Sequence, residues 1–434
     1  MVEERTRMDE DIKDFFLSMA DELRTTPDAP SDLLLRRVRR RRLRTVGATV
    51  LALAVVSAGT VGAIRAFGGP RRPAPAEGAC SKGWSLSPAR SVGYYTFLSG
   101  LAAASPDDVW AVGSVGGNPS YPLVEHWDGE RWSVVPSPRL LGAELGGVDV
   151  VSGTDIWAVG ADTGARTLIE HWDGRRWSVL PSPNFVQRTW KHNVLAAVSG
   201  TAPEDVWAVG WTGDGSGRRA RALIEHWDGS SWSLVTSPHV DSKQVVLYDV
   251  ASLGHDDVWA VGQQRIGPST RTLVLHWDGS AWSVVQTPNP EWAFESLWGV
   301  AGVGPDDVWA VGRASDQGLV SLHPIVMHWD GSGWTLIRDL PSDHPYGLEA
   351  VDAAGPDNVW AGDKAIPYAY ALHWDGRRWS LVAPPGGPIK GGLLNGIVAF
   401  SDGEALAVGS RSSETGMSPV AVHLCSSARS ASAG

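Results

Sequence analysis

Cysteine is almost absent from this 434-residue chain, which contains only Cys80 and Cys425. None lies in the first 79 residues, so a cysteine-ligated zinc module of the anti-sigma kind is not supported there. Phosphate-binding loops, nucleophile elbows and closely spaced metal ligands are also missing. The sequence therefore predicts no catalytic motif, no metal site and no cofactor.

Basic residues are scarce beyond the N-terminal region. Residues 73–434 hold 23 Lys and Arg against 38 Asp and Glu, whereas residues 1–72 hold 14 against 10. An acidic domain repels the phosphate backbone of DNA and RNA. We therefore expect no nucleic-acid partner.

Long apolar runs are also rare, and the one that stands out is the uncharged segment from Thr45 to Ile64. Its 20 residues span a bilayer at about 1.5 Å of rise per residue. Seven arginines between Arg36 and Arg44 keep the preceding side cytoplasmic. We expect an uncleaved membrane anchor with the C-terminal bulk outside. A cleaved signal peptide is the alternative, but the segment before the arginines is long for one.

Tryptophan, by contrast, is abundant, and 19 of the 23 tryptophans belong to a repeat. The pattern of a copy is L-x-x-V, then DVWAVG, a variable stretch and HWDG-x-x-W. Six copies are complete, and a degenerate seventh, from Leu394 to Leu424, lacks its third tryptophan. Trp84 supplies that tryptophan from the other end of the chain. Four short apolar runs per period of about 40–50 residues predict an all-β, seven-bladed β-propeller with one blade shared by both ends.

The two cysteines map onto a single position of this repeat. In a complete copy an Asp such as Asp128 follows HW and lies four residues before the third tryptophan. Cys425 follows His423-Leu424, and Cys80 lies four residues before Trp84. We predict a disulfide between them that closes the ring, which implies an oxidising compartment.

The segment HWDGRRWSVLPSP, His171 to Pro183, resembles the kelch repeats of galactose-oxidase-like propellers. DVWAVG is similar to the kelch strand that ends in two glycines, although here one glycine is present and the following turn is shorter. A remoter similarity is to Asp-box propellers. The combined motifs look most like actinobacterial, membrane-anchored proteins with VWAVG and HWDG repeats. The resemblance covers Cys80 to Cys425 and implies the fold, but propellers include oxidases, isomerases, hydrolases and binding proteins.

Repeat spacing predicts which face of the propeller carries function. We name the four strands of a blade a to d along the chain. The strand a Val lies nine residues before the strand b Trp, and HW lies five before the third Trp. By contrast, DVW to HW varies from 14 to 20 residues, and the third Trp to the next strand a Leu from 13 to 18. The b–c and d–a loops share one end of the sheets, so we expect binding on that face.

Candidate ligand-binding residues lie in strand a and in these loops. Most copies have small residues between the strand a Leu and Val, but three carry Tyr248-Asp249, Trp298-Gly299 and Glu349-Ala350. Strand a lines the central channel, so these side chains are expected near its mouth. Simple filling of the channel is the alternative. The candidate set comprises Tyr248, Asp249, Trp298, Glu349, Asn395, Trp190, Trp211 and Trp292.

The histidines of HW occur once per blade and do not converge, so we expect hydrogen-bonding roles for them rather than metal binding. The acids before VW, taken as Asp108, Asp155, Asp205, Asp257, Asp307 and Asp357, are expected to cap the a–b turns.

These observations favour a single-pass membrane protein whose extracytoplasmic propeller binds a glycan, a wall component or another protein without catalysis. The alternative is an envelope carbohydrate-active enzyme that uses Asp249 and Glu349 as a glycosidase-like pair. We expect the apolar helical stripe from Ile12 to Leu23 either to dock a cytoplasmic regulator or to lie on the membrane surface. The expected order is a cytoplasmic segment 1–44, a transmembrane helix 45–66, a Gly/Pro linker 67–79, the propeller 80–425 and a disordered tail 426–434.

Overall fold

The computed structural model describes residues 86–87, 95–116, 119–185, 190, 192–215, 218–290, 292–316, 322–341, 347–363, 368–382, 389–390, 392–413 and 416–425. The chain divides into two compact units, Met1–Ala48 and Thr49–Gly434, and every described residue belongs to the second. Within these described ranges, no helix has the length and apolar character to cross a membrane. The predicted cytoplasmic segment, transmembrane helix, linker and tail all lie outside them.

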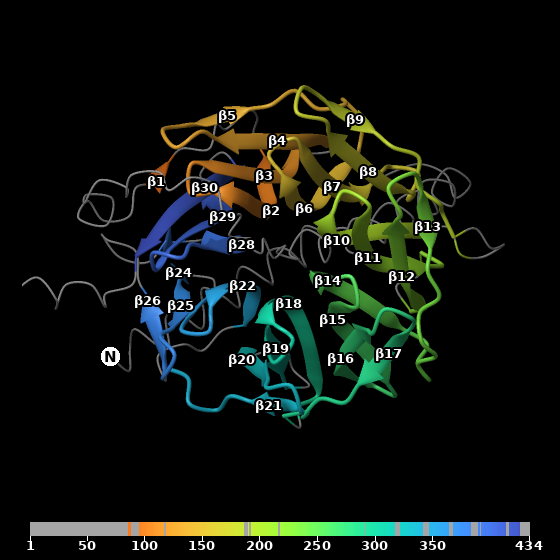
Figure 1. The fold of residues 1–434 in the computed structure, drawn as a ribbon, viewed down its shortest axis with the longest axis vertical. Helices are drawn as coiled ribbons and strands as arrows, with labels where there is room; N and C mark the ends of the chain where they lie inside the picture. The colour runs from red at the N-terminus through yellow and green to blue at the C-terminus, as the bar shows by residue number, and fades with distance from the viewer. Residues whose placement is uncertain are drawn as a thin grey trace, which may run out of the picture. The chain divides into compact units, whose positions relative to one another are not determined.

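Seven four-stranded antiparallel sheets form the blades of a β-propeller, which confirms the predicted all-β fold. The first strand of each sheet contacts the first strand of the next, and β28 contacts β2, so the ring closes (Figure 1). The blades are, in order, β2 (Thr96–Ser105), β3 (Asp108–Val115), β4 (Tyr121–Trp127), β5 (Trp132–Val134); β6 (Glu144–Ser152), β7 (Asp155–Ala161), β8 (Thr167–Trp172), β9 (Trp177–Val179); β10 (His192–Ala202), β11 (Asp205–Gly213), β12 (Ala220–Trp227), β13 (Trp232–Leu234); β14 (Val245–Gly254), β15 (Asp257–Ile266), β16 (Ser269–Trp277), β17 (Trp282–Val285); β18 (Phe294–Gly304), β19 (Asp307–Ser315), β20 (Leu322–Trp329), β21 (Trp334–Leu336); β22 (Leu348–Gly355), β23 (Asn358–Asp363), β25 (Ala371–Trp374), β26 (Trp379–Val382); and β28 (Gly392–Ala399), β29 (Glu404–Ser413), β30 (Gly416–Cys425), β1 (Leu86–Ser87).

The seventh blade is shared by the two ends of the propeller, as the repeat predicts. β1 pairs with β30, with Leu86 opposite Val422 and Ser87 opposite Ala421. One further small sheet joins β24 (Tyr368–Ala369) to β27 (Ile389–Lys390) outside the seven blades.

Tryptophans of the repeat join neighbouring blades. The ring of Trp110 in blade 1 lies 5.2 Å from that of Trp172 and 5.8 Å from that of Trp177, both in blade 2. The same contacts recur between the next four pairs of blades. Tilted and edge-to-face aromatic contacts add to the area that these side chains bury. The repeated tryptophans therefore pack neighbouring blades against each other.

Each HW histidine of blades 1–6 is tied to strand b of its own blade. In blade 1, Asp108 Oδ1 accepts hydrogen bonds from Trp110 Nε1 at 3.0 Å and His126 Nε2 at 2.8 Å. This confirms the hydrogen-bonding role of the histidines and gives the recurring acids a role that differs from turn capping. In blade 6 the equivalent residue is Asn358 rather than Asp357. Its Oδ1 bonds the Trp360 and His373 ring nitrogens in the same way. The expected list of acids was wrong there by one residue.

Every strand a carries a β-bulge directly after its conserved Leu. Pairing with strand b shifts between Leu247 and Asp249 in blade 4, and between the equivalent residues of the other six blades. The bulge pushes a carbonyl against the glycine of VWAVG. A Cβ on Gly262 would lie 2.0 Å from Val246 O, and the geometry is similar in five other blades. This close approach is why each of these copies keeps a glycine there.

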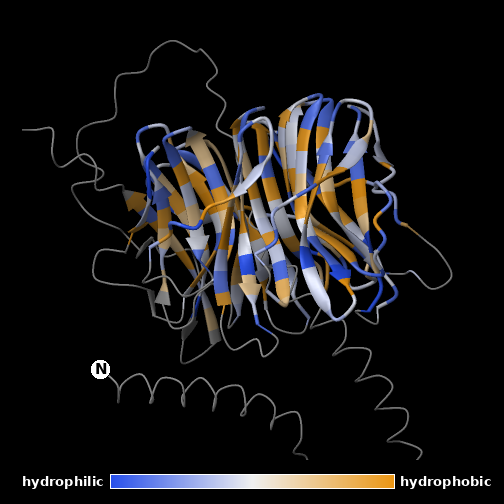
Figure 2. Ribbon diagram, turned by 90° about the horizontal axis from the view of Figure 1, so that it is seen from below, coloured by the Kyte–Doolittle hydropathy of each residue, from blue (hydrophilic) through white to orange (hydrophobic). Residues whose placement is uncertain are grey.

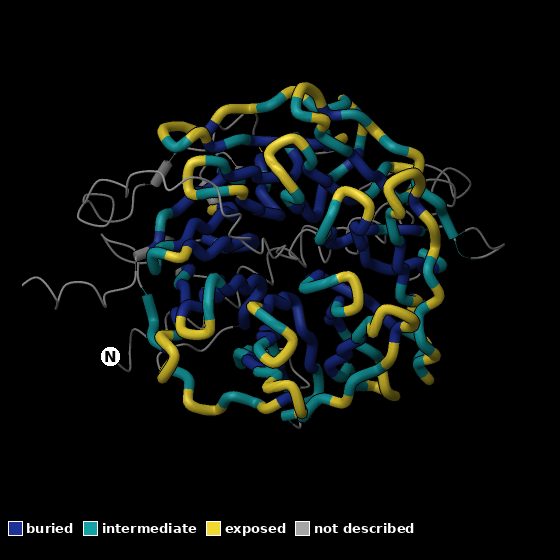
Figure 3. The backbone as a smooth tube through the Cα atoms, viewed as in Figure 1, coloured by how far each residue is buried: buried dark blue, intermediate teal, exposed yellow. Residues whose placement is uncertain are grey.

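Successive antiparallel strands place the constant a–b and c–d turns on one face and the variable b–c and d–a loops on the other. We name these the constant face and the variable face. The blades seen from the side carry hydrophobic residues through their thickness (Figure 2). Inner strands are buried, while exposed backbone is concentrated in turns, loops and the outer rim (Figure 3).

Candidate functional site

The bulges form a row of one extra residue per blade around the channel. We name it the bulge row, and it consists of Ser99, Gly146, Ala196, Tyr248, Trp298, Glu349 and Asn395. A bulge re-aims the side chain of its unpaired residue and often accompanies functional sites. Four of the predicted ligand-binding residues therefore occupy equivalent positions in blades 4–7.

Large side chains of the bulge row stack into one cluster. The rings of Tyr248 and Trp298 lie 3.9 Å apart with planes at 13°, and Trp211 meets Tyr248 edge-on at 6.3 Å. The guanidinium of Arg313 lies 4.6 Å from the Trp298 ring centre, and its Nη1 lies 3.0 Å from Glu349 Oε1. The cluster thus runs from blade 3 to blade 6 through aromatic, cation–π and ionic contacts.

This cluster is packed rather than open. Tyr248 is 4% exposed, Trp298 3% and Glu349 0%. Burial raises the pKa of the Tyr248 hydroxyl above its ordinary value, so the group stays protonated at physiological pH. The structure therefore differs from an exposed aromatic platform at the channel mouth, because the large side chains fill the space between one another. Their role in binding a ligand stays a prediction.

Asp249 lies next to the bulge, and its carboxylate bridges two blades. Its Oδ2 accepts a hydrogen bond of 2.9 Å from the backbone N–H of Val300 in blade 5. Burial raises its pKa well above the usual range, and the carboxylates of Asp352 and Asp149 raise it further. Asp249 therefore belongs electrostatically with other channel carboxylates.

Those two carboxylates make the same kind of bridge. Asp149 Oδ2 accepts from Gly200 N at 2.7 Å, and Asp352 Oδ2 accepts from Ala399 N at 2.7 Å. Burial raises the pKa of Asp352 to about 8, with a further contribution from Asp149. Acids in blades 2, 4 and 6 thus link each of these blades to the next one. Neither Asp149 nor Asp352 was singled out from the sequence, although both follow the strand a Val.

Asn395 has a comparable structural role. Its Nδ2 donates a hydrogen bond of 2.8 Å to the carbonyl of Leu98, across the junction between blade 7 and blade 1. The side chain is 2% exposed. It therefore supports ring closure in this structure.

The remaining two candidates lie apart from the cluster and are half-buried. Arg221 stacks over Trp190 at 4.8 Å from the ring centre. Trp292 stacks on His323 at 4.0 Å, and its carbonyl accepts a hydrogen bond of 2.7 Å from Arg271. The structure therefore does not bring Trp190 and Trp292 together with the bulge row.

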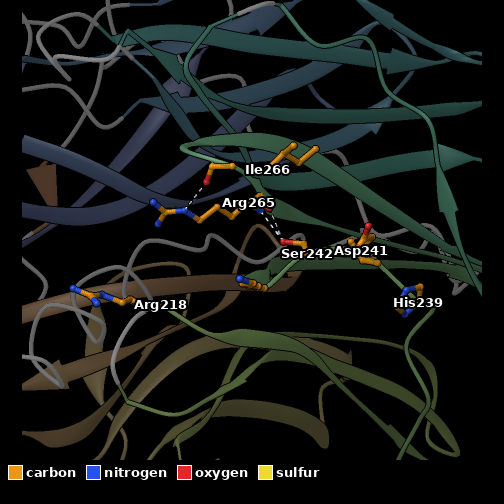
Figure 4. Close-up of a pocket in the computed structure, with 9 residues that line it drawn as sticks. Arg218, His239, Asp241, Ser242, Arg265 and Ile266 are labelled. Carbon is orange, nitrogen blue, oxygen red and sulfur yellow. Dashed lines mark hydrogen bonds between the residues drawn. The ribbon is translucent and has the colours of Figure 1, made fainter.

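A pocket of about 600 Å³ lies on the variable face between blades 3 and 4. It is formed by the two b–c loops and by the d–a segment that leads into β14 (Figure 4). Its lining consists of Arg218, His239, Val240, Asp241, Ser242, Lys243, Arg265, Ile266 and Gly267. None of these residues belongs to the candidate set predicted from the sequence. Lys243 and Arg265 were missed because they carry no motif and meet only when adjacent blades pack.

Comparison with solved structures shows that this fold is shared. YCF48 from Cyanidioschyzon merolae is 15% identical with a TM-score of 0.51, and the match covers 79% of this chain and 99% of that one. YCF48 bound to D1 peptide is 12% identical with a TM-score of 0.50, over 85% of this chain and 100% of that one. The SapL1 lectin in complex with alpha methyl fucoside is 14% identical with a TM-score of 0.44, over 69% and 99%.

At such identities the likeness supports the propeller fold alone. No model of a known protein family matches the sequence, and the comparison with curated proteins finds no match either.

Proposed function

We propose that this protein is a membrane-anchored, extracytoplasmic propeller that binds a glycan, a cell-wall component or a protein through its variable face. The observation that carries the proposal is the position of the pocket. It is built from b–c and d–a loops, which are the segments whose lengths vary between repeats. A rigid ring with variable loops on one face is an arrangement that suits recognition.

A binding role is favoured over catalysis because the two candidate carboxylates are already engaged. Asp249 bonds the backbone of blade 5, and Glu349 is paired with Arg313. Both side chains are 0% exposed. A glycosidase needs two carboxyl groups that reach the scissile bond. The alternative enzyme would therefore require the packed cluster to open.

YCF48, of similar fold, has been solved with a peptide bound, so a ring of this kind is compatible with a binding role. We further propose that the DVWAVG and HWDG blades are a variant of the kelch-type blade, of the sort found in actinobacterial anchored repeat proteins. The shortened turn and the single glycine are what distinguish them.

The proposed location is tested by protease added to intact cells. Residues 1–44 should be spared and the propeller degraded, because the arginine block keeps its side of the span cytoplasmic. Release of the complete propeller into the medium without lysis would contradict the anchor.

The proposed binding role is tested with the purified full chain on glycan arrays and in pull-downs from envelope extracts. A variant in which the 214–219 loop of blade 3 is shortened to the tight turn of blade 4 should lose the ligand. The matched control changes Arg175 and Arg377, which lie in c–d turns on the constant face. Loss of binding in the control alone would show that the wrong face had been assigned.

A further inference from the structure

We propose that the pocket between blades 3 and 4 binds an acidic sugar, whose carboxylate or phosphate is held by Lys243, Arg265 and Arg218. This inference rests on the proposed function, since it assigns a ligand class to the variable face. It goes further by naming the site and the chemistry that recognises the ligand.

Charge is the first argument. Arg218, Lys243 and Arg265 line the pocket with one carboxylate, Asp241. The surrounding propeller is strongly acidic, with 38 acidic against 23 basic residues after residue 72. A local cationic pocket in such a domain concentrates anions where the rest of the surface repels them. Arginine and lysine are also the usual partners of carboxylate and phosphate oxygens.

Rigidity is the second argument. Three segments that form the pocket are joined by hydrogen bonds, so it is built before any ligand arrives. Ala220 N donates to Lys243 O at 3.1 Å, and Arg265 N donates to Gln244 O at 2.9 Å. Ser242 Oγ also donates to Arg265 O at 2.8 Å. A preformed site loses less conformational entropy on binding.

The third argument concerns what surrounds the cations. His239 and Asp241 are exposed polar groups of the d–a segment and suit sugar hydroxyls. Val240 and Ile266 add small apolar surfaces, with Ile266 53% exposed, which suit the C–H face of a sugar ring. The guanidinium groups of Arg218 and Arg265 extend toward the same side of the pocket, while His239 lies at the opposite end (Figure 4). An acidic sugar presents this combination of one anionic end and a hydroxylated ring.

Binding to the detergent-solubilised full chain is measured by calorimetry with three probes. Oligogalacturonate carries carboxylates, a phosphorylated mannose oligomer carries phosphates, and a neutral dextran oligomer of similar length is the reference. We expect binding of one or both acidic probes and none of dextran. The stronger acidic probe identifies which oxyanion source the pocket takes. Affinity should fall as salt rises, because the contact is ionic.

Lys243→Gln and Arg265→Gln should each weaken acidic-probe binding about tenfold, which is the usual cost of one charge-assisted hydrogen bond. The matched control is Arg175→Gln, which removes the same charge from the constant face and should leave affinity unchanged. Thermal unfolding of all three variants should match that of the parent, since these side chains are exposed.

Three results would overturn the inference. Equal loss in Arg175→Gln would show that only net charge matters. Poly-glutamate or phosphatidylglycerol vesicles that bind as tightly, with the same dependence on Lys243 and Arg265, would identify a protein or membrane partner instead. Binding of a neutral glycan that neither pocket variant affects would leave the proposed function standing and refute this site. A full chain that binds nothing on the arrays, in the pull-downs or among these probes would refute both.

Discussion

Buried carboxyl groups occupy one repeat position in three blades only. A glutamate precedes the HW histidine in strands β4, β8 and β12, and each is 0% exposed. Both carboxyl oxygens of Glu170 lack a hydrogen-bond partner among the described residues. Burial raises its pKa from 4.5 to about 8, so it remains protonated in the folded protein at neutral pH. Glu125, Glu170 and Glu225 thus stand where blades 4–6 have Leu275, Met327 and Leu372.

Glu170→Leu copies the side chain that other blades already use, and it should stabilise the protein at pH 8. The folded-state pKa is raised, so the favourable contribution of Glu170 is fully present below pH 4.5. This contribution to the free energy of unfolding is lost as the pH rises from 4.5 to about 8, because the Glu170 carboxyl ionises in the unfolded chain before it ionises in the folded protein. We expect a gain of about 1–3 kcal/mol in the free energy of unfolding at pH 8, from removing an unsatisfied buried group.

Urea denaturation of both proteins at several pH values measures this effect. The gain should shrink toward pH 4.5, since protonated Glu170 is then neutral in both states. Glu170→Gln should remove the same pH dependence without adding apolar contacts. A stability difference independent of pH would show that Glu170 does not titrate as described.

Trp298 provides a second test at the level of one side chain. It is 3% exposed and lies between Tyr248 and Arg313. Trp298→Ala should therefore cost about 3–5 kcal/mol, as truncation of a buried tryptophan does. The half-buried Trp190 is the matched control, and Trp190→Ala should cost clearly less. Guanidinium denaturation measures both, and a nearly neutral Trp298→Ala would indicate an open pocket at the bulge row.

Among the secondary-structure elements, the bulge in strand a is what shapes the channel. It leaves one residue per blade unpaired, and in six blades the strand b residue opposite the conserved Leu is a glycine, whereas blade 6 has Asp363 there. Blades 4 to 6 use the unpaired position for Tyr248, Trp298 and Glu349. Tyr248 stacks on Trp298 across a blade boundary, and Arg313 joins Trp298 to Glu349. One backbone irregularity, repeated around the ring, thus decides which side chains meet at its centre.

Gly262→Ala should therefore be strongly destabilising. The added Cβ would lie 2.0 Å from Val246 O, which is a backbone atom that cannot turn aside. We expect a loss of about 1–3 kcal/mol or more from this overpacking. Gly304→Ala is the control, because no atom lies within 4 Å of its added Cβ. Thermal unfolding compares the two, and equal melting temperatures would argue against the bulge geometry.

Strand order and blade number could be predicted from the sequence because they follow from periodic apolar runs and fixed spacings. The bulge could not, since it depends on the carbonyl that faces each glycine after pairing. For the same reason Arg313 was missed, as it follows the glycine in strand b and meets Glu349 only through blade packing. The alternative enzyme hypothesis used Asp249 and Glu349 together, and the sequence could not show that Asp249 bonds Val300 N and that Glu349 pairs with Arg313.

Considered as a whole, the propeller depends on one junction that the chain does not close by itself. Six blades are continuous in sequence, whereas the outer strand of the seventh comes from the other end of the propeller. Within the described residues, β1 pairs with β30 at Leu86 and Ser87. A covalent link at this junction would prevent the two ends from separating.

The predicted disulfide between Cys80 and Cys425 would be that link. The side chains of both cysteines lie outside the described residues, but the β1–β30 register has a direct bearing on them. Extended by two residues, it would pair Trp84 with Leu424, as Trp132 pairs with Trp127 in blade 1. The repeat then assigns both cysteines to the adjoining turn.

We expect the non-reduced protein to be lighter than the reduced one by two hydrogens, and to contain no reactive thiol. Replacing both cysteines by serine should cost about 2–4 kcal/mol, the usual effect of removing a native disulfide. Reductant should lower the melting temperature of the parent protein to that of the double variant and leave the double variant unchanged.

Two titratable thiols per chain in protein isolated from outside the cytoplasm would show that the ring is closed by strand pairing alone.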